Sequence, residues 1–166
     1  MNWQLFISSL IIGIIITCIT LFFNVYFKAY EYLLQLFPLY LITGLGIYTS
    51  INNHLYSSKV AKDMDRITMC FAAFIYLCYT CFIKDTEIRI MFISLIVLMC
   101  ILYLYSKYIK NKKKKLSTII HMIVHCLVII VFSIIITEVS INNTQELDVT
   151  KVPSLLKNSA MRYPFK

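Results

Sequence analysis

The sequence predicts an all-α protein, a bundle of about five helices that crosses a membrane several times. Of the 166 residues, 60% are hydrophobic and only 14% are charged, which is too apolar for an ordinary soluble domain. Three glycines and three prolines leave few helix breaks. Several apolar runs reach the length of about 20 helical residues that a bilayer core requires. We therefore expect a polytopic membrane protein with a single domain.

Five apolar runs account for the predicted helices, and they occupy residues 4–27, 33–56, 65–83, 88–106 and 117–139. The first run begins almost at Met1, has no basic segment before it and is too long for a signal-peptide core, so we expect it to be retained. The polar stretch after the fifth run contains Pro153 and Pro164 and is expected to lack stable structure. The chain thus divides into a transmembrane bundle, residues 1–140, and a polar, flexible C-terminal tail, residues 141–166.

Most of the net charge of +8 lies in the connections between the predicted spans. The second and fourth connections together hold nine Lys and Arg residues, whereas the first and third hold three. The positive-inside rule places the second and fourth connections in the cytoplasm, together with the N-terminus. Because the basic residues follow the membrane topology, we expect no nucleic-acid partner.

All three histidines lie towards the ends of apolar runs, where an ionisable side chain is expensive and marks a functional-site hypothesis. Ser50 and His54 are four residues apart and would share one face of a helix. The same holds for His121 and His125. Span two ends, span three begins and span five begins on the same side of the membrane. The alternation of spans therefore brings Ser50 and all three histidines to the depth of Asp65.

Three neutral imidazoles in a partly dry site suit Zn²⁺, so we predict that His54, His121 and His125 bind zinc. A catalytic zinc keeps a fourth position for water and lowers the pKa of that water to about 7. Asp65 can orient this water or accept its proton, and Ser50 can donate a hydrogen bond to a developing oxyanion. These roles describe hydrolysis of an amide or ester. The position at the membrane boundary favours a lipid substrate whose tails stay in the bilayer.

Other interpretations of the same residues stay open. Intramembrane histidines can serve as packing contacts, and Asp65 can merely cap the start of span three. His54 and His121 could instead supply two axial ligands to a haem. A metal could also staple a non-catalytic or receptor-like bundle, or the chain could be a structural membrane protein, for instance of a viral envelope, without metal.

The cysteines give little support to redox chemistry or to a second metal site. They lie inside apolar runs and lack the paired spacing of a zinc knuckle, which favours buried small hydrophobes. Cys78 and Cys81 form a C-x-x-C in spacing only, with no thioredoxin-like βαβ context around it. The six are Cys18, Cys70, Cys78, Cys81, Cys100 and Cys126.

The segments Ser50-x-x-x-His54, Asp65 and His121-x-x-x-His125 resemble the pattern of a superfamily of membrane hydrolases. It includes the alkaline ceramidases, the progestin and adiponectin receptors with their haemolysin-III-like relatives, and the Per1-type lipid remodelling proteins. The resemblance covers the motif segments only. It implies a zinc held by the three histidines, with Asp65 on the zinc-bound water and Ser50 nearby.

The chain departs from this superfamily in its number of spans. Members characteristically have seven, whereas the sequence predicts five and only one between Asp65 and His121. Losing two spans keeps the motifs on one side of the membrane but removes walls of a lipid-binding cavity, so a homo-oligomer could be needed to enclose it. We predict a zinc-dependent intramembrane hydrolase of a ceramide-like lipid amide, with an ester or phospholipid as the next substrate class. An endomembrane and a viral envelope are both compatible locations.

Overall fold

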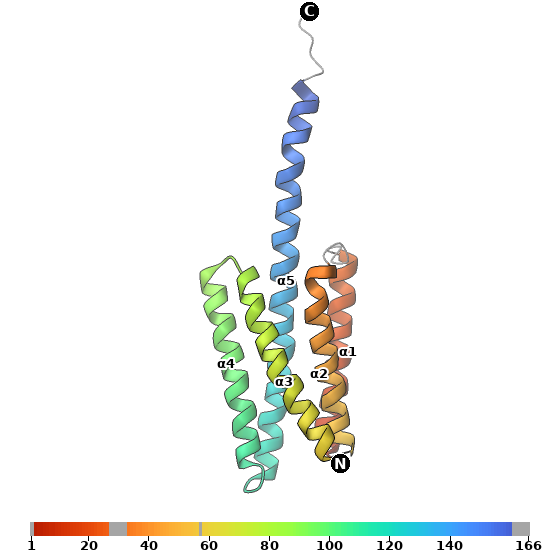
Figure 1. The fold of residues 1–166 in the computed structure, drawn as a ribbon, viewed down its shortest axis with the longest axis vertical. Helices are drawn as coiled ribbons and strands as arrows, with labels where there is room; N and C mark the ends of the chain where they lie inside the picture. The colour runs from red at the N-terminus through yellow and green to blue at the C-terminus, as the bar shows by residue number, and fades with distance from the viewer. Residues whose placement is uncertain (1, 27–32, 57, 161–166) are drawn as a thin grey trace, which may run out of the picture.

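A computed structural model describes residues 2–26, 33–56 and 58–160, with side chains described up to Ile141. It contains five α-helices and one short 3₁₀ helix, and no strand among the described residues (Figure 1). In chain order these are α1 (Trp3–Tyr26), α2 (Leu33–Tyr56), α3 (Lys59–Cys78), η2 (Tyr79–Phe82), α4 (Thr86–Ile109) and α5 (Lys114–Ala160). The predicted all-α helix bundle is confirmed.

Five segments of the described chain are long and apolar enough to cross a membrane, as the sequence predicted. They are Trp3–Tyr26, Leu33–Tyr56, Lys59–Phe82, Thr86–Ile109 and Lys114–Ile141. Many large apolar side chains lie on the outside of the bundle, among them Ile14, Leu34 and Phe71. Lipid rather than water suits such a surface, so the chain is compatible with a multi-pass membrane protein.

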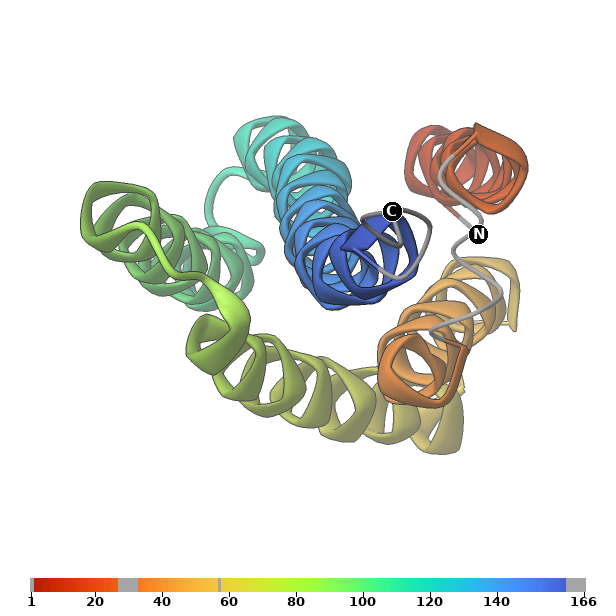
Figure 2. The ribbon, with the colours of Figure 1, turned by 90° about the horizontal axis from the view of Figure 1, so that it is seen from above.

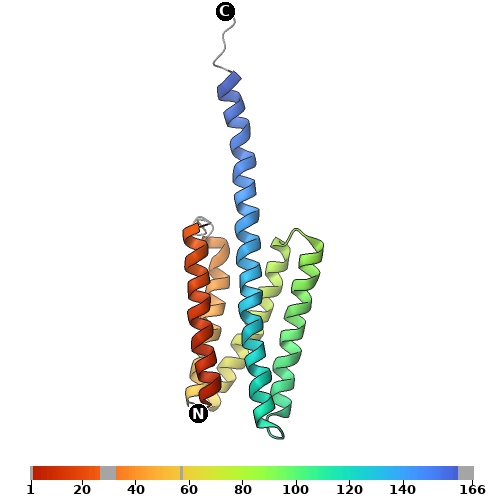
Figure 3. The ribbon, with the colours of Figure 1, turned by 180° about the vertical axis from the view of Figure 1, so that it is seen from behind.

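Helix α5 lies at the centre of the bundle. Seen from above, α1, α2, α3 and α4 form an arc around it (Figure 2). Helix α5 packs along α4 on one side and along α1 on the other, while α2 packs against both α1 and α3 (Figure 3). Helix α3 is tilted, so it runs from beside α2 at one end of the bundle to beside α4 at the other (Figure 1). Contacts between α2 and α5 themselves are few.

The third helix begins earlier than the sequence predicted. We expected span three to start near residue 65, but α3 starts at Lys59, with Ser58 as its N-cap accepting a hydrogen bond from the Ala61 backbone N–H (3.1 Å). The basic residues that we assigned to a connection thus lie in the first two turns of a helix. Asp65 is therefore neither the cap of α3 nor part of its first turn, so the helix dipole does not explain its position.

The fifth helix extends beyond the predicted span. We expected irregular chain from about residue 140, but the backbone of α5 stays helical to Ala160 and projects from the bundle (Figure 1). Extending an existing helix adds one hydrogen bond per residue and needs no new nucleus, which favours continuation of the span into the tail.

The cysteines differ from the expectation that they fill the core. Five are exposed on the outer faces of the helices and Cys100 is half-buried, and all six are free thiols. In an apolar helix of a membrane protein, the outer face is as apolar as the core, so the hydrophobicity of the runs did not distinguish the two positions.

Buried polar side chains are concentrated at the end of the bundle where α2 ends and α3 and α5 begin. The remainder of the core is mostly apolar, with Leu36, Phe92 and Phe132 fully buried, although Thr43 and Ser140 are also buried there. The N-terminus is tied to the polar end, because the Asn2 backbone N–H donates to the carbonyl of His54 (3.3 Å). The fold therefore places one polar, enclosed region at one end of an otherwise apolar bundle.

Candidate metal centre

The three histidines of the chain meet in one buried cluster, as predicted. His54 comes from the last turn of α2, and His121 and His125 come from successive turns of α5. One ring nitrogen from each lies within 4.8 Å of the others, and all three residues are buried. Their ring centroids are 4.8 to 6.1 Å apart. The cluster could hold a metal ion.

The donor atoms fit a metal in their chemistry as well as in their position. The Nε2 atom of His54 is buried and has no hydrogen-bond partner among the described residues. A buried polar atom without a partner costs roughly 1–3 kcal/mol, and coordination to a cation would remove that cost. Tetrahedral nitrogen ligands at about 2.0–2.1 Å from zinc lie roughly 3.4 Å apart, so small side-chain rotations suffice to bring this set together.

His125 is oriented by a serine of α1. The Ser8 hydroxyl donates its only proton to the Leu5 carbonyl (2.9 Å), and its Oγ lies 2.9 Å from Nδ1 of His125. We therefore assign Nδ1 of His125 as the protonated nitrogen that donates to Ser8. The lone pair of its Nε2 then remains for a ligand. Such a hydrogen bond on the second ring nitrogen is typical of histidines that bind metals.

Ser50 lies beside the cluster, where the sequence placed it. Its Oγ is 3.5 Å from Nε2 of His125 and 3.0 Å from Oγ of Ser9. Ser9 already donates to the Leu5 carbonyl (2.9 Å), so the Ser50 hydroxyl has Ser9 as its nearest acceptor. To donate to a substrate oxygen, Ser50 would have to exchange this bond for a new one.

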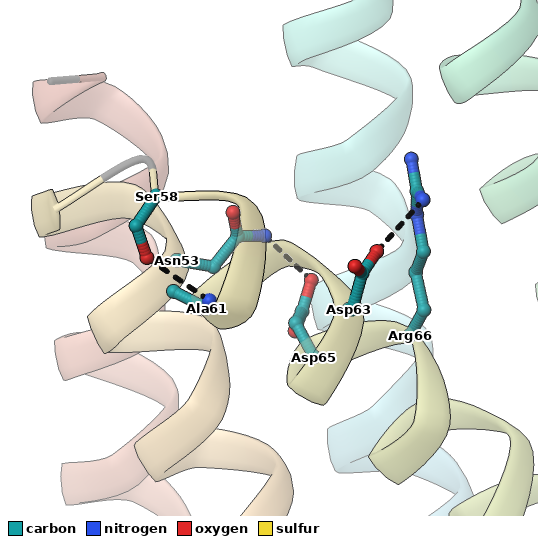
Figure 4. Close-up of polar contacts among 6 residues, drawn as sticks. All are labelled: Asn53, Ser58, Ala61, Asp63, Asp65 and Arg66. Carbon is teal, nitrogen blue, oxygen red and sulfur yellow. Dashed lines mark hydrogen bonds and ion pairs between the residues drawn. The ribbon is translucent and has the colours of Figure 1, made fainter.

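Asp65 is hydrogen-bonded to the residue that precedes a candidate ligand. It is 2% exposed, and its Oδ2 accepts a hydrogen bond of 2.6 Å from the amide of Asn53, the residue before His54 (Figure 4). Asp65 is not one of the residues in the three-histidine group. Its carboxylate thus lies in the surroundings of the cluster rather than among the candidate ligands.

Asp63 has a different environment although it is two residues away. It lies in α3, not in a connection as we expected, and it forms an ion pair of 3.2 Å with Arg66. Its side chain is 47% exposed. Figure 4 shows Asp63 directed to Arg66 and Asp65 directed to Asn53. Two positions along an α-helix are about half a turn, so Asp63 and Asp65 point to opposite sides of α3.

Two cavities of different character meet the histidines. One has a volume of about 280 Å³ and is polar, with His54 and His121 in its wall. The other is narrow and apolar, with Ser50 and His125 in its wall. Asp65 lines neither of these two. The cluster therefore separates a polar chamber at the end of the bundle from an apolar pocket deeper inside it.

Sequence reasoning missed four residues around the histidines. Ser8 and Asn53 hold His125 and Asp65, as described above. Tyr103 of α4 packs its ring 5.7 Å from that of His121, and its hydroxyl is buried without a partner among the described residues. The ammonium group of Lys107 lies 4.8 Å from the Tyr103 ring centroid. The sequence shows a tyrosine and a lysine at the end of span four, but it does not show that they lie beside His121.

Comparison of this chain with protein-family models, with curated proteins and with solved structures found no match.

Proposed function

We propose that the protein is a zinc-dependent intramembrane hydrolase of a lipid amide. The observation that carries this proposal is the buried cluster of three imidazoles. Nε2 of His54 has no hydrogen-bond partner among the described residues, and the contact of Ser8 with Nδ1 of His125 leaves Nε2 of that ring for a ligand. Three neutral imidazoles match the ligand set of catalytic zinc sites. When bound, zinc supplies Lewis acidity and a water whose pKa is lowered to about 7.

The residues of the chain have separate roles in this proposal. His54, His121 and His125 hold the ion, and Ser8 fixes the ring of His125. Asp65 accepts the proton that the attacking water loses and returns it to the leaving amine as the C–N bond breaks. This requires Asp65 to reach the chamber from its position beside Asn53. Ser50 stabilises charge that develops on the substrate oxygen once it gives up its bond to Ser9.

The choice of a ceramide-like lipid amide depends on the resemblance to the superfamily of alkaline ceramidases, progestin and adiponectin receptors and Per1-type proteins. We propose that the chain is a shortened member of that group. The support is that Ser50, His54, Asp65, His121 and His125 occupy one end of the bundle, as the pattern requires.

A second candidate is a non-catalytic protein in which a metal joins α2 to α5. The observation in its favour is that Asp65 lines neither cavity and meets the polar chamber only through its hydrogen bond to Asn53. Both candidates require the metal, and only the first requires turnover.

The test is elemental analysis of protein purified without a His-tag, followed by assay on a lipid amide and a lipid ester. We expect about one zinc per chain and its loss from His54→Ala, His121→Ala and His125→Ala. Met122→Ala, which changes an exposed neighbour on the same helix, is the matched control and should keep the metal. Unchanged metal content in all three variants would refute the site, and zinc without turnover would select the second candidate. A strong Soret absorption band would indicate haem instead.

A further inference from the structure

The polar chamber next to the histidines is lined by an unusual excess of cationic side chains. It lies where α4 ends and α3 and α5 begin, with the candidate ligands His54 and His121 in its wall. Five cationic residues line it, and none of its lining residues is acidic. The five are Lys62, Arg66, Lys107, Lys110 and Lys114.

Little of this charge is compensated by the carboxylates nearby. Asp63 pairs with Arg66 at 3.2 Å, which neutralises one of the five. Asp65 is close enough to Lys107 for their charges to interact. It does not line the chamber, but it accepts a hydrogen bond from Asn53, which does. The chamber therefore keeps a strong positive potential, and its low-dielectric walls concentrate that potential inside.

Lys107 is the chamber lysine whose charge acts on the histidine cluster. It is half-buried over the Tyr103 ring, and its charge acts on all three imidazoles. A cation at this position repels a divalent ion and is itself costly to remove from water. An anion that lies between the lysine and the histidines would relieve both costs.

The two cavities together fit an amphiphile rather than a small ion alone. A cavity of about 280 Å³ has many times the space that a single water requires, which accommodates a phosphate group and its linker. On the other side of the histidines lies the apolar pocket, whose wall includes Ile12, Ile47 and Val128. That pocket has a volume of only about 40 Å³, so it holds the first few carbons of a chain. A lipid with its headgroup in the chamber and these carbons in the pocket would present the bond between them to the cluster.

We propose that the chamber binds the phosphate group of an anionic amphiphile, so that the lipid amide of the proposed function carries an anionic phosphate headgroup. The identity of the cleaved bond rests on the proposed hydrolase function, whereas binding of the headgroup does not. Phosphate oxygens accept several charge-assisted hydrogen bonds, and lysines supply the matching donors as point charges. A free phosphate has the same chemistry and would lack only the contribution of the apolar pocket.

The test is a titration of the full-length protein in a non-ionic detergent with soluble short-chain lipids. The probes are dioctanoyl phosphatidic acid, dioctanoyl phosphatidylcholine, dioctanoylglycerol and inorganic phosphate. We expect phosphatidic acid to bind at least about tenfold more tightly than the two lipids without net charge, and its affinity to fall as salt rises. Equal affinity for the three lipids would overturn the proposal. If inorganic phosphate bound as tightly as phosphatidic acid, the proposal that the ligand is an amphiphile would be overturned.

Matched double variants separate the chamber from general surface charge. Lys107→Gln/Lys110→Gln removes two chamber charges and should weaken phosphatidic acid binding about tenfold or more. Lys59→Gln/Lys113→Gln removes the same charge from exposed positions at the same end of the bundle and should stay within about twofold. Equal losses in the two variants would overturn the proposal.

Two further measurements keep the outcome clear. Lys107→Arg/Lys110→Arg retains the charge and should keep most of the preference for phosphatidic acid. This result would exclude a folding defect as the cause of the weaker binding in the Lys107→Gln/Lys110→Gln variant. Selective binding without any turnover would refute the hydrolase and leave the headgroup site intact. Turnover of a neutral lipid amide with no preference for phosphate would refute the headgroup site and leave the hydrolase intact.

Discussion

In the candidate metal centre, a single hydrogen bond fixes the orientation of each of two polar side chains, those of His125 and Asp65. The Ser8 hydroxyl fixes one nitrogen of His125, and the Asn53 amide fixes one oxygen of Asp65. The histidines could be predicted because three imidazoles in apolar runs are conspicuous. Ser8 could not, since 117 residues separate it from His125 and a serine in an apolar helix usually bonds to its own backbone.

The first prediction concerns the two aspartates. Asp65→Asn keeps the shape of the side chain but cannot accept a proton, so turnover should fall by roughly 10²–10⁴-fold while zinc stays bound. Asp63→Asn removes only an exposed ion pair and should leave turnover within a few-fold of the unmodified protein. Steady-state kinetics and elemental analysis measure both effects. Equal losses of turnover, or loss of zinc from Asp65→Asn, would mean that Asp65 is structural or a ligand.

The second prediction concerns the serine behind His125. Ser8→Ala leaves the imidazole in place but removes its orienting acceptor, so zinc affinity should fall by about 10–100-fold. Competition with a zinc chelator of known affinity measures the change. Thr17→Ala is the control, because Thr17 also bonds to a carbonyl of α1, that of Gly13, at an exposed site (2.7 Å). Equal zinc affinity in the two variants would show that Ser8 does not orient the ligand.

At the scale of the helix, the presence of each membrane span was easier to predict than the residues at which the helix begins and ends. Apolar length fixed the positions of all five spans. The start of α3 was missed because Lys59, Lys62 and Arg66 resembled a connection, although Ser58 was a readable N-cap signal. The polar composition after residue 140 gave no indication that α5 continues, because a helix can propagate through residues that would not start one.

The third prediction concerns the packing of α1 on α2, which carries Ser8 and Ser9 to the histidines. A Cβ added at Gly13 would lie 3.2 Å from Cγ2 of Ile47, so Gly13→Leu should separate the two helices. We expect a lower unfolding temperature in detergent and a lower zinc content. Gly44→Leu faces open space and serves as the control. Equal stability in the two variants would show that close approach at Gly13 is not required.

At the scale of the molecule, the parity of the spans brings the candidate site together. His54 and His121 are 67 positions apart in number, yet their rings lie 5.3 Å apart because an even number of crossings separates the two segments. This convergence could be predicted from the sequence alone. The polar chamber and the apolar pocket on either side of the histidines could not be predicted. Their walls combine side chains from four or more helices, and the hydrophobic pattern does not specify how these helices are rotated.

The fourth prediction tests this topology. Single cysteines at Lys59 and Lys112, in a background without the native cysteines, should react with a membrane-impermeant reagent from the same side. A cysteine at Asp85 should react from the opposite side, because one span separates it from each of the others. Labelling of positions 59 and 112 from opposite faces would be incompatible with the fold.

The sparse contact between α2 and α5 has a thermodynamic consequence. Each of these helices packs along α1, but they have few contacts with each other, and they are the two that supply the candidate ligands. A metal that binds only when α2 and α5 are close would stabilise that arrangement in proportion to its own concentration, by about 2.7 kcal/mol at a hundred times the dissociation constant. Helix spacing and metal supply would then be linked, so that a scarcity of the ion in the membrane's surroundings would loosen the bundle between two helices that have few contacts of their own.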